Sequence, residues 1–239
     1  MKPHLPTALR RALLAALAVA ALAPAAWAET FTLTQDTSYK CGEGDWSLGA
    51  AFKSENTAVS YKFTSNPENK YSLSFSGGTA GVFYNNSGGS SFDYLTFTQL
   101  NELSFSGNES GSLGGAIYSR SGDITLSGNT GDITFSGNIA GYEGGAIYNF
   151  IGTITLSKNS GTITFSDNES GSSGGAIFGV ISLSKNIGDI EFSGNHTESH
   201  GGAIYSFGGA ISLTENGAIT FSGIKQATTA VLFTATKAP

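Results

Sequence analysis

The chain has 239 residues, of which 39% are hydrophobic and 13% are charged. Twelve basic residues stand against eighteen acidic ones, so the formal net charge is -6. This balance excludes a typical nucleic-acid binder, because affinity for phosphates comes from Lys and Arg. The single cysteine, Cys41, excludes an internal disulfide bond.

Residues 1–28 predict a signal peptide. Arg10 and Arg11 precede an alanine- and leucine-rich run, and Ala26 and Ala28 occupy the small-residue positions of a cleavage site. Cleavage would leave Glu29 first and remove three of the twelve basic residues, so nine would remain against eighteen acidic ones, a net charge of -9. No later apolar run reaches the roughly 18 residues of a membrane helix. We expect an exported chain without a transmembrane helix, either secreted or associated peripherally with an outer membrane.

A unit of about 30 residues recurs between Leu103 and Gly223, with two motifs in step. The phenylalanine of the first motif advances by 30, 30, 27 and 29 positions, and a steady period in this range is the signature of a repeat architecture. The first motif, Phe-x-x-Asn, begins and ends at Phe105 and Asn108, Phe135 and Asn138, Phe165 and Asn168, and Phe192 and Asn195. The second motif, Gly-Gly-Ala-Ile, comprises Gly114, Gly115, Ala116 and Ile117; Gly144, Gly145, Ala146 and Ile147; Gly174, Gly175, Ala176 and Ile177; and Gly201, Gly202, Ala203 and Ile204.

Each unit contains three short strand patterns, in which apolar residues alternate with small polar ones. The apolar positions Phe135, Ile147, Leu156 and Phe165 are separated by 12, 9 and 9 residues. This spacing predicts an all-β fold, a right-handed parallel β-helix with three strands and about 30 residues per coil, in which the phenylalanines form an interior column. An antiparallel hairpin is the alternative, since Lys158–Gly161 suits a tight reversal.

The repeated asparagines and glycines have structural explanations in this coil. Asparagine tolerates left-handed backbone and bonds to nearby backbone groups, so we expect it to end strands and to stack as a ladder. A second set of asparagines, in Leu-x-x-Asn, repeats the pattern at Asn129, Asn159, Asn186 and Asn216. The glycine pairs suit a sharp corner. The 27-residue unit loses three residues between Ile177 and Leu183, which shortens a turn and keeps the strands.

The repeat is incomplete at both ends. Phe63–Asn66 matches Phe-x-x-Asn, and Phe75–Gly78 precedes Phe105 by 30 residues, but no Gly-Gly-Ala-Ile follows either. We therefore expect a cap and a divergent coil in residues 29–70, the repeat domain in residues 71–223, and a C-terminal cap or truncated end in residues 224–239.

Phe-x-x-Asn alternating with Gly-Gly-Ala-Ile resembles the passenger repeats of the chlamydial polymorphic membrane proteins, over residues 71–223. The resemblance implies a β-helical passenger that an autotransporter route displays at the bacterial outer surface. It also implies adhesion to a host-cell receptor or glycan, with the repeated motifs tied to adhesion. Members of that family continue into a C-terminal membrane β-barrel, whose amphipathic strands are not found before Pro239. A truncated member, a fragment and a short secreted relative remain alternatives.

The competing function is a carbohydrate-acting β-helix enzyme, which needs acids at a defined separation or acids around Ca²⁺. The acids here are scattered over turns and loops, and we expect no enzyme, no cofactor and no metal site. The acids that we weighed are Asp123, Asp132 and Asp189 at turns, and Glu109, Glu143 and Glu169, which would stack in one column. His196, Glu198 and His200 alternate and would share one face if the segment were extended, but a polar loop is the favoured interpretation.

The predicted mechanism of adhesion is multivalent, because repeated loops present many weak contacts in register. The loops that we expect to make these contacts are residues 109–113, 139–143, 169–173 and 196–200.

Overall fold

The computed structural model describes residues 27–33, 37–40, 52–54, 59–65, 71–79, 81–86, 93–226 and 233–236. The predicted signal peptide lies outside these residues except for Trp27 and Ala28, which begin the first strand. Cys41 also lies outside them.

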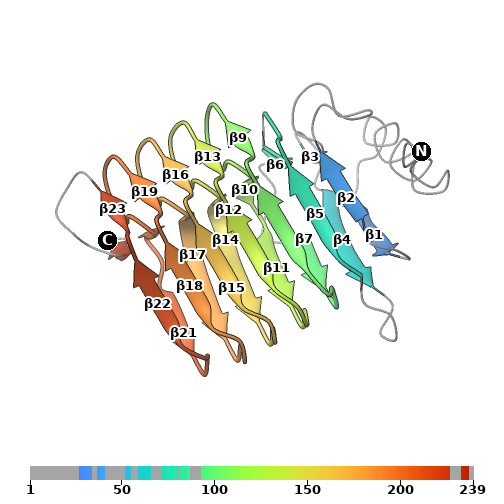
Figure 1. Ribbon diagram of the computed structural model, residues 1–239. Helices are drawn as coiled ribbons and strands as arrows, with labels where there is room; N and C mark the ends of the chain where they lie inside the picture. Colours follow the sequence, from blue (N-terminus) through green and yellow to red (C-terminus); the bar gives the residue numbers. More distant parts are fainter. Residues whose placement is uncertain are drawn as a thin grey trace.

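The described residues form a parallel β-solenoid, in which strands of successive coils stack in three sheets (Figure 1). The described part of the chain contains no helix, and therefore none long and apolar enough to cross a membrane. The predicted all-β parallel coil is confirmed. The hairpin alternative is wrong, because Ile154 and Ile163 lie in different sheets and each pairs in parallel with its counterpart about 30 residues away.

The three sheets differ in length and in the part of the coil that they form. The large sheet contains β1 (Trp27–Leu33), β3 (Phe52–Ser54), β4 (Val59–Ser65), β6 (Phe83–Asn85), β7 (Asp93–Thr98), β10 (Ile117–Ser121), β11 (Asp123–Ser127), β14 (Ile147–Ser157), β17 (Ile177–Ser184), β20 (Ile204–Phe207), β21 (Ile211–Thr214) and β24 (Phe233–Thr236). The Phe sheet contains β2 (Thr37–Lys40), β5 (Leu73–Ser76), β8 (Leu103–Ser106), β12 (Ile133–Ser136), β15 (Ile163–Ser166), β18 (Ile190–Ser193) and β22 (Ile219–Ser222). The corner sheet contains β9 (Glu109–Ser110), β13 (Ile139–Ala140), β16 (Glu169–Ser170), β19 (His196–Thr197) and β23 (Lys225–Gln226).

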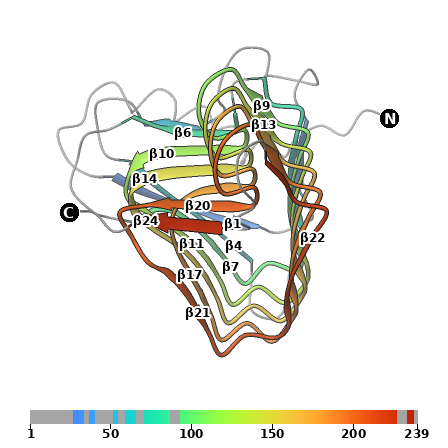
Figure 2. The same ribbon diagram turned by 90° about the vertical axis from the view of Figure 1, so that its left-hand side faces the viewer.

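Viewed along the stack, the coils superpose on one roughly triangular outline (Figure 2). The large sheet bends at one corner and forms two sides. We call them the Ile side, which carries Ile117, Ile147, Ile177 and Ile204, and the Leu side, which carries Leu126, Leu156, Leu183 and Leu213. The Phe sheet is the third side. The corner sheet lies in a loop that projects where the Phe sheet meets the Ile side.

A column of phenylalanine rings fills the interior along the Phe sheet, as predicted. The ring centroids lie 4.8 to 5.0 Å apart from Phe75 through Phe105, Phe135, Phe165 and Phe192 to Phe221. This spacing equals the distance between neighbouring strands of a sheet, so the rings stack face to face because the coils do. Phe63 lies in another column, since its partner is Phe97 and then Leu126, so its motif corresponds to Leu-x-x-Asn on the Leu side and not to the Phe-x-x-Asn of the Phe sheet.

The asparagines of Phe-x-x-Asn form the predicted ladder inside the coil. The Asn138 side chain accepts hydrogen bonds from N and Nδ2 of Asn108, at 3.1 and 2.9 Å. Its own Nδ2 donates to Phe105 O and to Asn168 Oδ1, at 3.1 and 2.9 Å. The same bonds recur from Asn168 to Asn195, and a second ladder runs through Asn129, Asn159, Asn186 and Asn216.

The left-handed backbone lies one residue before each ladder asparagine and not, as predicted, at the asparagine itself. Gly107, Gly137 and Gly194 have φ of 58°, 59° and 63°, and Asp167 takes the same conformation with φ 53°. Three of these four positions are glycine, because glycine adopts positive φ without steric cost, whereas Lys158, Lys185 and Glu215 take the same conformation before asparagines of the second ladder. The asparagine is selected by the bonds of the ladder.

The two glycines of each pair serve different purposes. Gly144 has φ 67°, which turns the chain into the Ile side. Gly145 allows a close approach between coils, because a Cβ there would lie 2.1 Å from Gly175 O. The predicted sharp corner is confirmed.

The predicted shortening of one turn is also confirmed. β14 passes from the Ile side to the Leu side in eleven residues, and β17 makes the same passage in eight. The register shifts between Tyr148 and Thr153, while the strands on both sides remain paired. Three residues are thus removed from a corner without disturbing the stack.

Replacing Asn138 with alanine should lower the free energy of unfolding by about 2–4 kcal/mol, because it leaves buried donors of Asn108 without acceptors. Urea unfolding would measure the change. Asn216→Ala is the matched control, since Asn216 is partly exposed and water can replace its bonds. An equal loss in both variants would contradict the ladder's role.

Replacing Gly145 with alanine should cost about 3 kcal/mol or more, since the new methyl group would overlap backbone oxygens of Gly175 and Glu169. Gly111→Ala should change the free energy of unfolding by less than about 0.5 kcal/mol, because a Cβ there meets nothing within 4 Å. Thermal unfolding followed by circular dichroism compares the two. Similar midpoints would show that close packing at the glycine pair is unimportant.

Candidate functional site

The projecting corner is the candidate site. We define the loop edge as residues 109–113, 139–143, 169–173, 196–200 and 225–226, which follow one another up the stack. The first four segments are those predicted to make contacts. Each begins with a two-residue strand rather than with a free loop, because it pairs with its counterparts in the neighbouring coils. The loop edge is therefore held in register by backbone hydrogen bonds between coils.

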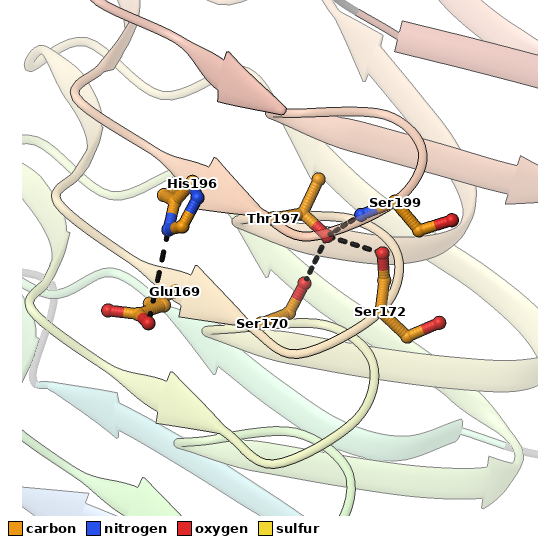
Figure 3. Close-up of polar contacts among 6 residues, drawn as sticks. All are labelled: Glu169, Ser170, Ser172, His196, Thr197 and Ser199. Atoms are coloured by element: carbon orange, nitrogen blue, oxygen red, sulfur yellow. Dashed lines mark hydrogen bonds and ion pairs between the residues drawn. The ribbon is translucent and has the colours of Figure 1, made fainter. Parts of the chain in front are cut away.

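The first residue of each corner strand faces solvent, and these residues form one outward column. In order they are Glu109, Ile139, Glu169, His196 and Lys225. Neighbouring strands lie about 4.8 Å apart, so the column presents a different side chain at each such step. His196 Nδ1 lies 3.9 Å from Glu169 Oε1 (Figure 3), an exposed pair with little effect on stability.

The second residue of the first four corner strands is buried, and Ser110, Ser170 and Thr197 hold their loops through hydrogen bonds, whereas Ala140 only packs. Ser170 Oγ donates to Thr197 Oγ1 at 3.0 Å, and Thr197 Oγ1 donates to Ser172 O (Figure 3). Ser110 makes a similar bond within its own loop, to Leu113 O at 3.2 Å. Buried hydroxyl groups therefore hold these loops in place, whereas the outward side chains differ from coil to coil.

The acidic column predicted for this corner is wrong. Ile139 lies between Glu109 and Glu169, and Glu143 belongs to a separate column with Ser173 and His200. The extended face proposed for the histidines is also wrong, because the strand ends at Thr197 and His200 bonds Ser199 instead. No group of three potential metal ligands was found among the described residues.

Two large apolar side chains stand out from the loop edge. Ile139 is 42% exposed and Tyr142 is 62% exposed, and both belong to the same loop. The coils on either side present Glu109 and Glu169 beside Ile139. The middle of the loop edge is thus an apolar projection between carboxylates.

An aromatic ladder covers the outer face of the Ile side, and sequence reasoning missed it. Tyr84, Tyr118, Tyr148, Phe178 and Tyr205 lie in register, with centroid separations of 4.8 to 5.5 Å. The signal was present in the sequence, since an aromatic residue follows every Gly-Gly-Ala-Ile motif. Burial, with smaller contributions from the neighbouring Glu143 and Tyr118, raises the pKa of the Tyr148 hydroxyl well above its usual range.

The predicted site residues all lie inside the coil. The Phe, Asn, Gly, Ala and Ile residues of both motifs are buried in all four copies. Their side chains face the core or the ladder, so they do not form part of the outer surface. Their contribution to adhesion stays a prediction.

The turn aspartates act between coils. Oδ1 of Asp123, Asp132 and Asp189 accepts the backbone N–H of Thr153, Thr162 and Ala218, at 2.8, 2.9 and 3.0 Å. Each carboxylate thus caps the coil that follows it.

Comparison with family models identifies the unit. Residues 102–120, 132–149, 162–180 and 189–207 each match the repeat described as Chlamydia polymorphic membrane protein (Chlamydia_PMP) repeat. Residues 102–207 thus carry four copies of the chlamydial polymorphic membrane protein repeat. No curated protein and no solved structure matched the chain.

The polymorphic membrane protein repeat has a definite place in the coil. The first match, residues 102–120, covers β8, β9 and most of β10, and the gap before the second match holds β11. The family unit therefore comprises the Phe sheet, the corner sheet and the Ile side, and it surrounds the loop edge. The Leu side lies outside it.

Burial raises the pKa of the Glu143 carboxyl, so the folded state binds its proton more tightly than the unfolded state does. Stability from this group is therefore fully present below the unfolded pKa and falls as pH rises through the folded pKa. Glu143→Gln should raise the free energy of unfolding at pH 7 by less than about 0.5 kcal/mol after solvent screening, and so raise the melting temperature slightly, with no such effect at pH 3.5. Melting curves at the two pH values test this, and an equal effect at both would contradict it.

Proposed function

We propose that this polymorphic membrane protein repeat chain is an exported surface protein that adheres to host cells through its loop edge. The observation that carries the proposal is the division of each coil between a constant interior and a variable exterior. The motif residues are identical in four coils and buried, whereas the outward column changes from Glu109 to Ile139, Glu169 and His196.

The division assigns the motifs an indirect part in adhesion. A buried asparagine or glycine cannot contact a receptor while the coil is folded, but it fixes the height and register of the loop beside it. Several loops fixed in one line can engage a partner together, so that weak contacts add up to a firm attachment. The changing side chains favour a receptor or glycan with a specific pattern over a regular lattice.

The enzyme alternative receives less support from the geometry. Asp123, Asp132 and Asp189 already accept backbone hydrogen bonds from neighbouring coils. An apolar residue separates Glu109 from Glu169 in the outward column.

Binding of the purified chain to cultured epithelial cells tests the proposal. The variant Ile139→Ser with Tyr142→Ser should reduce binding about tenfold or more, because loss of central apolar contacts typically costs more than about 1.4 kcal/mol. Its circular dichroism spectrum and melting temperature should remain those of the parent, since both side chains are exposed.

The matched control is Ile187→Ser with Phe207→Ser, which removes apolar side chains that are 78% and 61% exposed away from the loop edge. This control should bind as the parent does. Equal losses in both double variants would show that adhesion, if present, does not depend on the loop edge. Absence of binding by the parent would contradict adhesion by this chain itself.

A further inference from the structure

A second exposed apolar cluster lies at the corner where the Ile side meets the Leu side. Phe150 is 50% exposed and Ile151 is 52% exposed, in the turn that β14 makes between the two sides. We call these two residues the corner patch. The Phe150 ring lies parallel to that of Tyr148, with centroids 6.5 Å apart, so the patch extends the aromatic ladder to the edge of the coil. Apolar side chains that gather on a surface typically mark a contact with another molecule.

The corner is set back in the coil that follows the corner patch. β17 makes this passage in eight residues where β14 takes eleven, so its turn is shorter. One coil further on, Phe207 is 61% exposed and stands three residues after Ile204, as Phe150 stands three residues after Ile147. Neighbouring coils lie about 4.8 Å apart, so the two phenylalanines flank the shortened turn over about 9.6 Å.

The charge beside the corner patch is opposite to the charge beside the apolar projection of the loop edge. Arg120 lies next to Phe150 in the preceding coil, is exposed, and forms no salt bridge with a described carboxylate. On the loop edge, Glu109 and Glu169 lie in the coils before and after Ile139. In both places the charge stands one coil, or about 4.8 Å, from the apolar side chains. The two surfaces are therefore alike in apolar character and spacing and complementary in charge.

We propose that the loop edge of one copy of the chain binds the corner patch of another copy, so that copies associate side by side. Ile139 and Tyr142 of one copy pack on Phe150 and Ile151 of the other, while Arg120 pairs with a glutamate of the loop edge. The contact is heterologous, because the two copies use different surfaces. Figure 2 shows the Ile side running between these two surfaces, so that one copy can use both.

The proposal concerns association between copies and does not depend on adhesion to cells. A contact made by so few side chains is weak, so we expect association that rises with concentration. Sedimentation velocity of the purified chain over a range of concentrations, in a reducing buffer, measures it.

Two complementary variants test the contact. The corner variant, Phe150→Ser with Ile151→Ser, and the projection variant, Ile139→Ser with Tyr142→Ser, should each associate about tenfold or more weakly than the parent when alone. An equimolar mixture of the two should form a heterodimer, because one variant retains the projection and the other retains the corner patch. Ile187→Ser is the control and should associate as the parent does, although its side chain is 78% exposed.

Reversal of charges tests the pairing and gives the orientation of the copies. Arg120→Glu should weaken association several-fold, and a second reversal at the facing glutamate should restore it. Rescue by Glu109→Lys would mean that the copies point the same way along the stack, and rescue by Glu169→Lys would mean that they point in opposite ways. Rescue by neither would contradict the proposed pairing.

Three further results would overturn the proposal. They are a parent that stays monomeric at every concentration, equal weakening by Ile187→Ser and by the corner variant, and a mixture of the two double variants that stays monomeric. The corner variant leaves every residue of the loop edge in place, so a loss of association is distinguishable from a loss of adhesion.

Discussion

The structure depends on hydrogen bonds that no single coil can complete. A ladder asparagine inside the coil satisfies its amide only through the coils before and after it, as Asn138 does with Asn108 and Asn168. Because the amides are buried, each missing partner would cost the desolvation of a polar group. The ladder therefore fixes the register of every coil against its neighbours, and the phenylalanine column and the glycine contacts follow from that register.

This register determines which residues recur in every coil and which residues differ between coils. Residues that touch the next coil recur in every unit. At Gly145 only glycine is accommodated, since no Cβ fits between it and Gly175. Residues that face solvent carry no such restriction. The loop edge is the clearest case, because Ser170 and Thr197 hold it from within while Glu169 and His196 differ outside. A scaffold of this kind presents a defined but variable surface, as attachment to a host cell would require.

Much of the fold was predictable, because residues that recur at a fixed spacing in the sequence stack on one another in successive coils. The recurrence of Phe135 and Leu156 gave the sides of the coil and the column of rings. The corner strands were not predictable, since two residues carry no pattern of their own and become strands only by pairing between coils. For the same reason the place of Ile139 between Glu109 and Glu169 was missed, as it depends on register rather than on residue type. The position of the left-handed residue was missed because asparagine and the glycine before it both suit such a turn.

Hydrogen exchange of the asparagine side-chain amides, measured by nuclear magnetic resonance, tests the ladder most directly. The Nδ2 protons of Asn108, Asn138 and Asn168 should exchange as slowly as the most protected backbone amides, since each donates to a carbonyl and to the next asparagine. Asn101 supplies the solvent-exposed reference in the same spectrum, since its side chain is exposed and its one printed bond, from Nδ2 to Ser72 Oγ at 3.2 Å, is open to water. Exchange of the three ladder amides at the rate of Asn101 would contradict the account, because it would mean that the coils are not joined through their asparagines.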